Sequence, residues 1–202
     1  MELITDGERE VVDAQGGKSL GKVLDEERVR VRSEGRVITG IRVDGEVLER
    51  ERQDELGARS VGEFERVEIT TRNADELARE TLRELVEHVG QVERVIPELV
   101  GHLEAEEIQK AMALLAACCQ MWAVVQEALS KVGLVLDWDY GEVEVEGRSV
   151  GEWLGEMEGT LREMNEALTN RDYFMLGEVL SHEFSPAMGA WQRILKQLAE
   201  NA

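Results

Sequence analysis

The chain has 202 residues, a formal net charge of −20 at pH 7 and a sequence pI near 4.6. Nucleic-acid binding needs a basic surface and anionic lipid repels an acidic one, so we expect neither nucleic acid nor membrane as a partner. Hydrophobic residues make up 43% of the chain, which is enough for a buried core and excludes global disorder. No apolar run approaches the ~20 residues of a membrane span, and the sequence favours a cytoplasmic location.

The first part of the chain predicts a hairpin followed by a helix. Two strand-like segments flank Asp6-Gly7, a dipeptide typical of the two-residue turn that joins hairpin strands. Ser19 then precedes an apolar run with helical spacing, whereas Val29 and Val31 alternate as they would in a strand. We therefore expect a helix from about Ser19, and the sequence leaves its end open.

Two further strands follow before residue 72. The segment VITGIRVDGEVL, at 37–48, alternates as a strand does and contains a second turn signal, Asp44-Gly45. The short segment VEIT, at 67–70, predicts the last strand of this region. One face of the longer strand is expected to carry Val37, Thr39, Ile41 and Val43.

This order of elements resembles the ubiquitin-like β-grasp. The resemblance is carried by the opening hairpin, the helix start at Ser19-Leu20, the segment GIRVDGEVL and the phrase SVGEF at 60–64 before VEIT. It covers residues 1–71 and is one of fold order only. A ubiquitin-type modifier ends in a free Gly-Gly tail, whereas VEITT runs directly into a helical pattern, so conjugation is not implied. The resemblance implies a module that presents a sheet face to partners.

From residue 73 the apolar residues recur every three or four positions, which is typical of amphipathic helices. Four such stripes predict a four-helix bundle made of two helical hairpins. Pro186 falls inside the fourth helix, which it should kink or split because proline lacks the amide donor. The stripes occupy residues 82–103, 108–129, 154–168 and 173–198.

The segment LVLDWDYGEVEVEG, at 134–147, separates the two helical hairpins. It predicts an inserted β-hairpin with its turn near Asp139-Tyr140-Gly141. We therefore expect an α+β protein with two domains. The first is a β-grasp-like module at 1–71, and the second is a helical bundle at 72–202 that carries the β-hairpin.

One phrase recurs at predicted helix starts: RSVGEF at 59–64, RSVGEW at 148–153 and, more loosely, KSLGKV at 18–23. In the first two copies a glutamate follows the serine after three residues, as in a capping box. The serine oxygen accepts from a free backbone N–H, and the glutamate accepts from the N–H of the serine. We interpret the phrase as a repeated strand-to-helix junction, in which the capping box explains the serine and the glutamate but not the glycine.

Two glutamate–histidine pairs are the candidate metal ligands: Glu84 with His88, and Glu178 with His182. Inward-facing pairs of this kind hold two metal ions in some helical bundles. The usual spacing there is Glu-x-x-His, whereas both pairs here are Glu-x-x-x-His, and the apolar stripes supply no further glutamates at matching depth. Solvated histidines at the rim of the bundle are the plainer interpretation, so we expect no metal ion and no cofactor.

The sequence has no recognisable catalytic set. No serine, histidine and acid, and no cysteine and histidine, recur at a spacing typical of a nucleophilic enzyme. Cys118 and Cys119 are adjacent, so they cannot easily bridge, and their apolar surroundings predict burial of both. Two unpaired cysteines fit a reducing compartment.

These absences favour a non-enzymatic interaction or adaptor protein, one form of which is a chaperone-like holder of a partner segment. Residues 72–202 carry 11 basic and 25 acidic residues, a net charge of −14. We therefore expect a partner protein with a basic or amphipathic face. The alternative is an enzyme, a metal- or small-ligand-binding bundle that uses Glu84, His88, Glu178 and His182.

Overall fold

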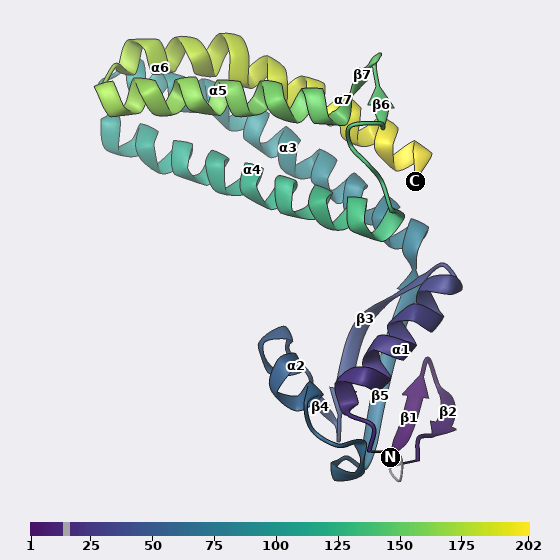
Figure 1. The fold of residues 1–202 in the computed structure, drawn as a ribbon. Coiled ribbons are helices and arrows are strands. Elements are labelled where there is room, and N and C mark those ends of the chain that lie inside the picture. The colour runs from purple at the N-terminus through teal and green to yellow at the C-terminus, as the bar shows by residue number, and fades with distance from the viewer. Residues whose placement is uncertain (14–16) are drawn as a thin grey trace. The chain divides into compact units, whose positions relative to one another are not determined.

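The computed structural model of the protein describes residues 1–13 and 17–202 (Figure 1). The chain divides into two compact units, Met1–Leu77 and Ala78–Ala202. The first is built around a five-stranded mixed sheet, and the second consists mainly of helices. The protein is therefore α+β, as predicted.

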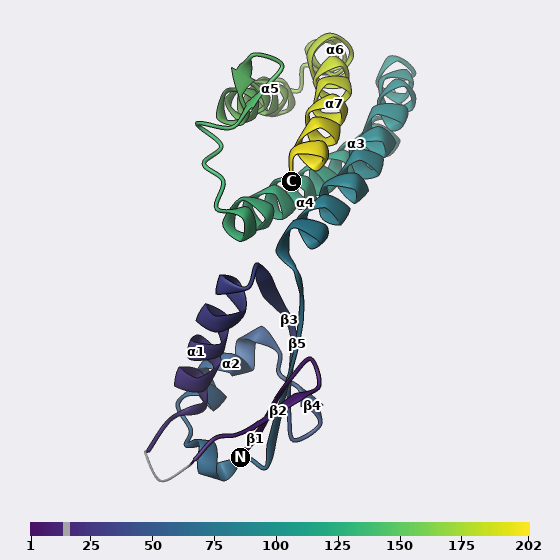
Figure 2. The ribbon, with the colours of Figure 1, turned by 90° about the vertical axis from the view of Figure 1, so that its right-hand side faces the viewer.

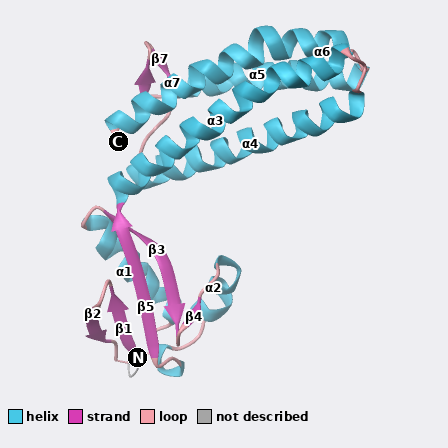
Figure 3. Cartoon of the chain, turned by 180° about the vertical axis from the view of Figure 1, so that it is seen from behind, coloured by secondary structure: helices cyan, strands magenta, loops and turns pink. Residues whose placement is uncertain are grey.

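The sheet of the first unit has the strand order β2-β1-β5-β3-β4 (Figure 3). Its strands are β1 (Glu2–Thr5), β2 (Glu8–Val11), β3 (Arg36–Val43), β4 (Glu46–Val47) and β5 (Arg66–Asn73). Strand β1 runs parallel to β5, with Leu3 opposite Val67, and the other neighbouring strands are antiparallel. A sheet of this kind followed by helices is compatible with a partial β-grasp-like fold.

Helix α1 (Leu20–Ser33) covers the sheet with its apolar face. Leu20 and Leu24 are almost fully buried and belong to the same core cluster as Val67 of β5. The helix continues through Val29 and Val31, so their strand-like alternation does not end it. Val31 is buried whereas Val29 is exposed, because the two side chains lie on different faces of the helix.

Both hairpin turns of this unit are confirmed. Asp6-Gly7 and Asp44-Gly45 have positive φ at both residues, which is the geometry of a type I′ turn. Strand β3 has the expected length, but its register shifts around Thr39, where an irregularity interrupts the alternation. Thr39 is consequently exposed, although the pattern placed it on the same face as the buried Ile41.

The sequence did not predict the second helix of this unit, α2 (Arg50–Gly57). Its sequence, RERQDELG, is rich in charge and has no apolar stripe, so the helical period leaves no signal there. It is followed by a single 3₁₀ turn, Val61–Glu63, whose Val61 is fully buried.

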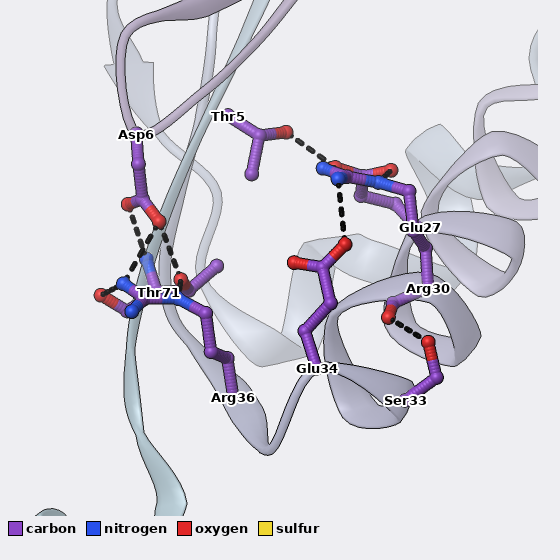
Figure 4. Close-up of polar contacts among 8 residues, drawn as sticks. All are labelled: Thr5, Asp6, Glu27, Arg30, Ser33, Glu34, Arg36 and Thr71. Atoms are coloured by element: carbon purple, nitrogen blue, oxygen red, sulfur yellow. Dashed lines mark hydrogen bonds and ion pairs between the residues drawn. The ribbon is translucent and has the colours of Figure 1, made fainter.

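Asp6 fastens the first turn to the middle of the sheet (Figure 4). Its carboxylate accepts hydrogen bonds from the hydroxyl of Thr71 at 2.5 Å and from the amide of Thr71 at 2.8 Å. Arg36 donates to the same carboxylate at 3.0 Å. These donors, above all the Thr71 hydroxyl, hold the pKa of Asp6 below its ordinary value.

A second polar cluster joins α1 to β1 (Figure 4). The buried carboxylate of Glu27 accepts from the hydroxyl of Thr5 and from two nitrogens of Arg30. Arg30 also pairs with Glu34, at 3.2 Å. The hydrogen bond from Arg30 is the main reason that the pKa of Glu27 is lowered. Arg30 is thus matched by acids of the same helix and of its C-cap.

The second unit is a four-helix bundle built of two helical hairpins (Figure 2). Helices α3 (Ala74–Glu104), which belongs to this unit from Ala78 on, and α4 (Ile108–Leu136) form the first hairpin. Helix α5 (Val150–Asn170) pairs with the split helix α6 (Tyr173–Val179), η3 (Leu180–Phe184) and α7 (Ser185–Asn201). The predicted stripes meet in one core, whose largest buried side chains are Trp122, Trp191, Phe184, Leu82, Ile96, Leu99, Leu129, Met157 and Leu176.

The inserted β-hairpin is shorter than predicted and lies later in the chain. It consists of β6 (Glu144–Val145) and β7 (Arg148–Ser149), with its turn at Glu146-Gly147. A turn does lie at Asp139-Tyr140-Gly141, where the amides of Glu142 and Val143 donate to the carbonyl of Asp139, but it does not join the hairpin strands as predicted, because α4 continues to Leu136 and ends at a left-handed Asp137. The apolar run LVL suits a strand or the last turn of a buried helix, and periodicity cannot separate the two over three residues.

Pro186 splits the last helix, as predicted. The proline ring would clash with the carbonyl of the residue four positions earlier, and proline has no N–H to donate. The preceding turn is widened into the π-helical segment η3, where the amide of Ser185 donates to the carbonyl of Leu180, five residues back. Pro186 then lies in the first turn of α7, where an amide donor is not needed. Such π turns occur frequently at functional sites.

Helix α4 is unusually apolar for this acidic chain, with no charged residue from 111 to 126. By length and composition alone it is apolar enough to cross a membrane, and only part of its apolar stretch is buried. Cys118 and Trp122 are buried in the core. The prediction that both cysteines are buried is wrong, because Cys119 points about 100° away from Cys118 and is exposed.

The repeated phrase caps a helix or helical turn at all three sites. Ser60 and Ser149 form the complete capping boxes that were predicted. Ser19 also accepts from the amide of Lys22, at 3.4 Å, but the reciprocal bond from the serine amide to a glutamate cannot form, because a lysine stands where the other copies have glutamate. The phrases at 18–23 and 59–64 also pair with each other, through a backbone bridge between Ser19 and Ser60.

The glycine of the phrase, which capping does not explain, permits close backbone packing at two of the sites. The amide of Gly151 donates to the carbonyl of Tyr140 at 2.7 Å, and a Cβ on Gly151 would lie 3.3 Å from that oxygen. A Cβ on Gly21 of α1 would lie 3.0 Å from the carbonyl oxygen of Gly57 in α2. A larger residue at either position would push the two segments apart.

Candidate functional site

The two predicted glutamate–histidine pairs lie on exposed or half-buried surface of the helical unit. Glu178 and His182 are 3.7 Å apart, and 53% and 72% of their side chains are accessible. Glu84 is exposed on α3, and His88 is half-buried, with its Nδ1 buried and without a hydrogen-bond partner. Within residues 1–13 and 17–202, no three His, Cys, Asp or Glu side chains are placed to hold one metal ion. Glu178 and His182 instead line two different grooves of the helical unit.

The first of these grooves, termed the end groove, lies where α3, α4 and α6 meet. It has a volume of about 590 Å³ and a floor of aliphatic and aromatic side chains. The residues that line it are Val100, Leu103, Glu104, Glu106, Ile108, Tyr173, Phe174, Gly177, Glu178 and Ser181.

Phe174 is the most unusual residue of the end groove, because 80% of its surface is exposed. Asp172 caps α6 by accepting from the amide of Met175 at 2.9 Å, which sets the helical phase of the residues that follow. In that phase Leu176 points into the core, and Phe174 points away from it. A large exposed aromatic side chain beside an apolar groove is typical of a surface that binds another molecule.

The rim of the end groove is acidic and poorly compensated. Glu107, just outside the lining, takes both nearby bases: Lys110 donates to it at 2.8 Å and His102 lies at 2.6 Å. The bond from Lys110 and then that from His102 lower the pKa of Glu107. Glu104 and Glu106 have no basic partner in the described part of the chain. The groove therefore presents free carboxylates around an apolar floor.

This arrangement offers an apolar surface with carboxylates beside it. The lining has no cysteine, lysine or histidine, and its only hydroxyls belong to Ser181 and Tyr173. An apolar side chain could be buried on the floor while a lysine or arginine beside it met the rim. Phe174 was not predicted as a site residue. The signal that could have found it is that Phe174 and Met175 stand next to Tyr173 but off the apolar stripe, so this segment has more apolar residues than one face of a helix can bury.

The fold and the site define a protein in which a small mixed sheet is followed by a four-helix bundle with surface grooves. The chain belongs to the family described as a domain of unknown function (DUF8042), whose model matches residues 80–194, more than half of the chain. Residues 1–73 match a second model, described as the TP0873 N-terminal domain. No curated protein and no solved structure matches the chain.

Proposed function

We propose that this protein is a non-enzymatic interaction or adaptor protein whose end groove binds a basic or amphipathic segment of another protein. The observation that carries the proposal is the exposed Phe174, which stands over an apolar floor and near Glu104 and Glu106, two glutamates with no basic partner among the described residues. A chaperone-like holder of such a segment is one specific form of this function. A cytoplasmic location fits it, since both cysteines are unpaired.

The energetics of the end groove support this proposal. Burying an exposed phenylalanine side chain contributes roughly 1.5–3 kcal/mol, so Phe174 could supply a substantial part of the affinity for a short segment. The carboxylates Glu104 and Glu106, together with Glu178, would attract a basic segment and accelerate its association more than they would slow its dissociation. The association rate should therefore fall as salt rises, while the dissociation rate changes less.

A photo-crosslinking amino acid placed at position 174 in the native host tests the proposal. We expect it to capture one dominant protein through a lysine- or arginine-rich amphipathic segment, identified by mass spectrometry. The same amino acid at Val29, which is exposed on α1 in the other unit, is the matched control. Equal capture from both positions, or a captured segment without basic residues, would contradict the proposal.

We also propose that residues 1–71 form a ubiquitin-like β-grasp module that presents its sheet to a partner. The strand order and the parallel pairing of β1 with β5 support this. A hollow of about 660 Å³ on the sheet adds to it, lined among others by Thr39, Arg42, Glu68 and Thr70. The substitution Arg42→Glu tests this. If it abolishes the binding of one partner protein while the crosslink at position 174 is unchanged, that partner has a separate contact with the sheet.

A further inference from the structure

A second groove of the helical unit, termed the α5–α7 groove, runs between α5 and the segment η3–α7. It has a volume of about 450 Å³. Its floor includes the buried Met157, Thr160 and Trp191, and carboxylates from both walls reach its rim. The ionisable side chains that line it are Glu156, Glu163, His182 and Glu183.

One end of this groove already holds a guanidinium group. The Arg148 guanidinium carbon lies 4.1 Å from the ring centroid of Trp153, over the face of the indole. The same guanidinium donates to the carboxylate of Glu156 at 2.7 Å. An aromatic face together with a carboxylate is a favourable site for arginine, because its planar cation can stack and form charge-assisted hydrogen bonds at once.

Two helical turns further along α5, the groove has a second carboxylate, that of Glu163, which has no guanidinium beside it in the described part of the chain. Glu163 stands seven residues after Glu156, and it lines the groove together with Glu183 of the π turn. The two side chains are close enough for the charge of Glu163 to disfavour ionisation of Glu183. His182, beside Glu183, is paired with Glu178. In the described residues no lysine or arginine pairs with Glu163 or Glu183.

We propose that the α5–α7 groove binds an arginine side chain of the partner protein, with its guanidinium between Glu163 and Glu183. The carbon chain of that arginine would lie on the apolar floor, and its positive charge would offset the repulsion between the two carboxyl groups. This inference rests on the proposed function, since a partner must supply the arginine.

Burial, and next the Glu163 carboxylate, raise the pKa of Glu183. Binding of a cation favours the deprotonated form, so affinity should rise with pH until Glu183 has lost its proton and then level off. The other ionisable groups that face the pair are Glu156, which is held by Arg148, and His182.

The probe is n-butylguanidinium, an analogue of the arginine side chain, added to the full chain and followed by NMR. We expect saturable shifts of the indole N–H signals of Trp153 and Trp191 and of the Glu163 and Glu183 side chains. Neutral n-butylurea has nearly the same shape and should give no saturable shift. The double variant E163Q/E183Q should weaken butylguanidinium binding at least about tenfold, the loss expected from one charge-assisted bond.

The variant E84Q is the matched control, because Glu84 is an exposed helix glutamate outside the groove. It should bind the probe as the unaltered chain does. Equal binding of butylguanidinium and butylurea, unchanged binding by E163Q/E183Q, or a loss in E84Q as large as in the double variant would overturn the inference. Neither Phe174 nor the natural partner takes part in this experiment, so its outcome is independent of the crosslinking result at the end groove.

Discussion

The indole rings of Trp122 and Trp191 meet edge to face, with their centroids 5.2 Å apart and their planes inclined at 64°. Trp122 belongs to α4 and Trp191 to α7, so this contact joins the two helical hairpins of the bundle. Both side chains are almost fully buried, and the Nε1 of Trp122 has no hydrogen-bond partner in the described part of the chain. Packing, not a polar network, therefore holds the hairpins together at this level.

The first prediction concerns this contact. The substitution Trp191→Ala should lower the free energy of unfolding of the helical unit by about 3–5 kcal/mol, because it removes a large buried side chain and leaves a cavity. Urea unfolding followed by tryptophan fluorescence measures this unit alone, since all four tryptophans lie in residues 78–202. Trp138→Ala is the control, because Trp138 is only half-buried and should lose clearly less. Equal losses would show that Trp191 is not a core residue.

The second prediction concerns the capping box of α5. The substitution Ser149→Ala should destabilise the helical unit by about 1 kcal/mol, because the amide of Glu152 loses its acceptor. Ser149→Thr keeps a hydroxyl at the cap and should recover most of that loss. The same fluorescence-detected urea curves provide the measurement. An alanine variant as stable as the threonine variant would remove the cap as the reason for the serine.

The third prediction is that alanine has opposite effects on stability at two glycines of the helical bundle. A Cβ on Gly155 of α5 would meet nothing within 4 Å, so Gly155→Ala should stabilise the unit by roughly 0.5–1 kcal/mol by reducing the freedom of the unfolded chain. A Cβ on Gly133 of α4 would lie 3.0 Å from the ring of Tyr140, whose hydroxyl donates to the Leu129 carbonyl. Gly133→Ala should therefore destabilise. Thermal unfolding of both variants gives the two signs, and equal signs would contradict the prediction.

The fourth prediction is a pH dependence of the first unit. Because the folded-state pKa of Asp6 is lowered, its carboxylate contributes stability that is complete above the ordinary value of 3.8 and is lost as pH falls through the lowered value. Asp6→Asn should reduce this loss of stability at low pH, because asparagine has no carboxylate to protonate. Asparagine also tolerates the left-handed backbone of the turn. The measurement is urea unfolding of the first unit between about pH 2 and pH 6, followed by NMR signals of Thr71. If the variant loses as much stability at low pH as the unaltered chain, the loss belongs to other carboxylates, of which Glu27 is the first candidate.

The elements with a strong local signal could be predicted from the sequence. The turns at Asp6-Gly7 and Asp44-Gly45, the capping boxes and the four apolar stripes each follow from residues close together in the chain. Helix α2 could not be predicted, because Leu56 is the only large apolar residue in its sequence, which therefore carries no stripe. The end of α4 was missed because three apolar residues fit a strand and a helix equally.

The candidate site was less predictable, since it depends on which side chains the fold leaves uncovered. The sequence shows an aromatic residue at position 174, but it does not show that its position on α6 turns the side chain away from the core. It likewise does not indicate that Glu163 and Glu183, twenty residues apart, face each other across a groove. Acidic residues are so common in this chain that their proximity has no sequence signal. Near this groove the sequence predicted only that Pro186 kinks or splits the last helix, and not that a π turn forms there.

The bridge between Ser19 and Ser60 has a consequence for synthesis. The amide of Leu20 donates to the carbonyl of Arg59 at 2.9 Å, and that of Val61 donates to Lys18 at 3.0 Å, so the start of α1 is completed by residues forty positions later. Strand β1 likewise receives its parallel neighbour only with Arg66–Asn73. On the ribosome the first hairpin and helix must therefore wait, and the unit can close only when the chain has passed residue 73.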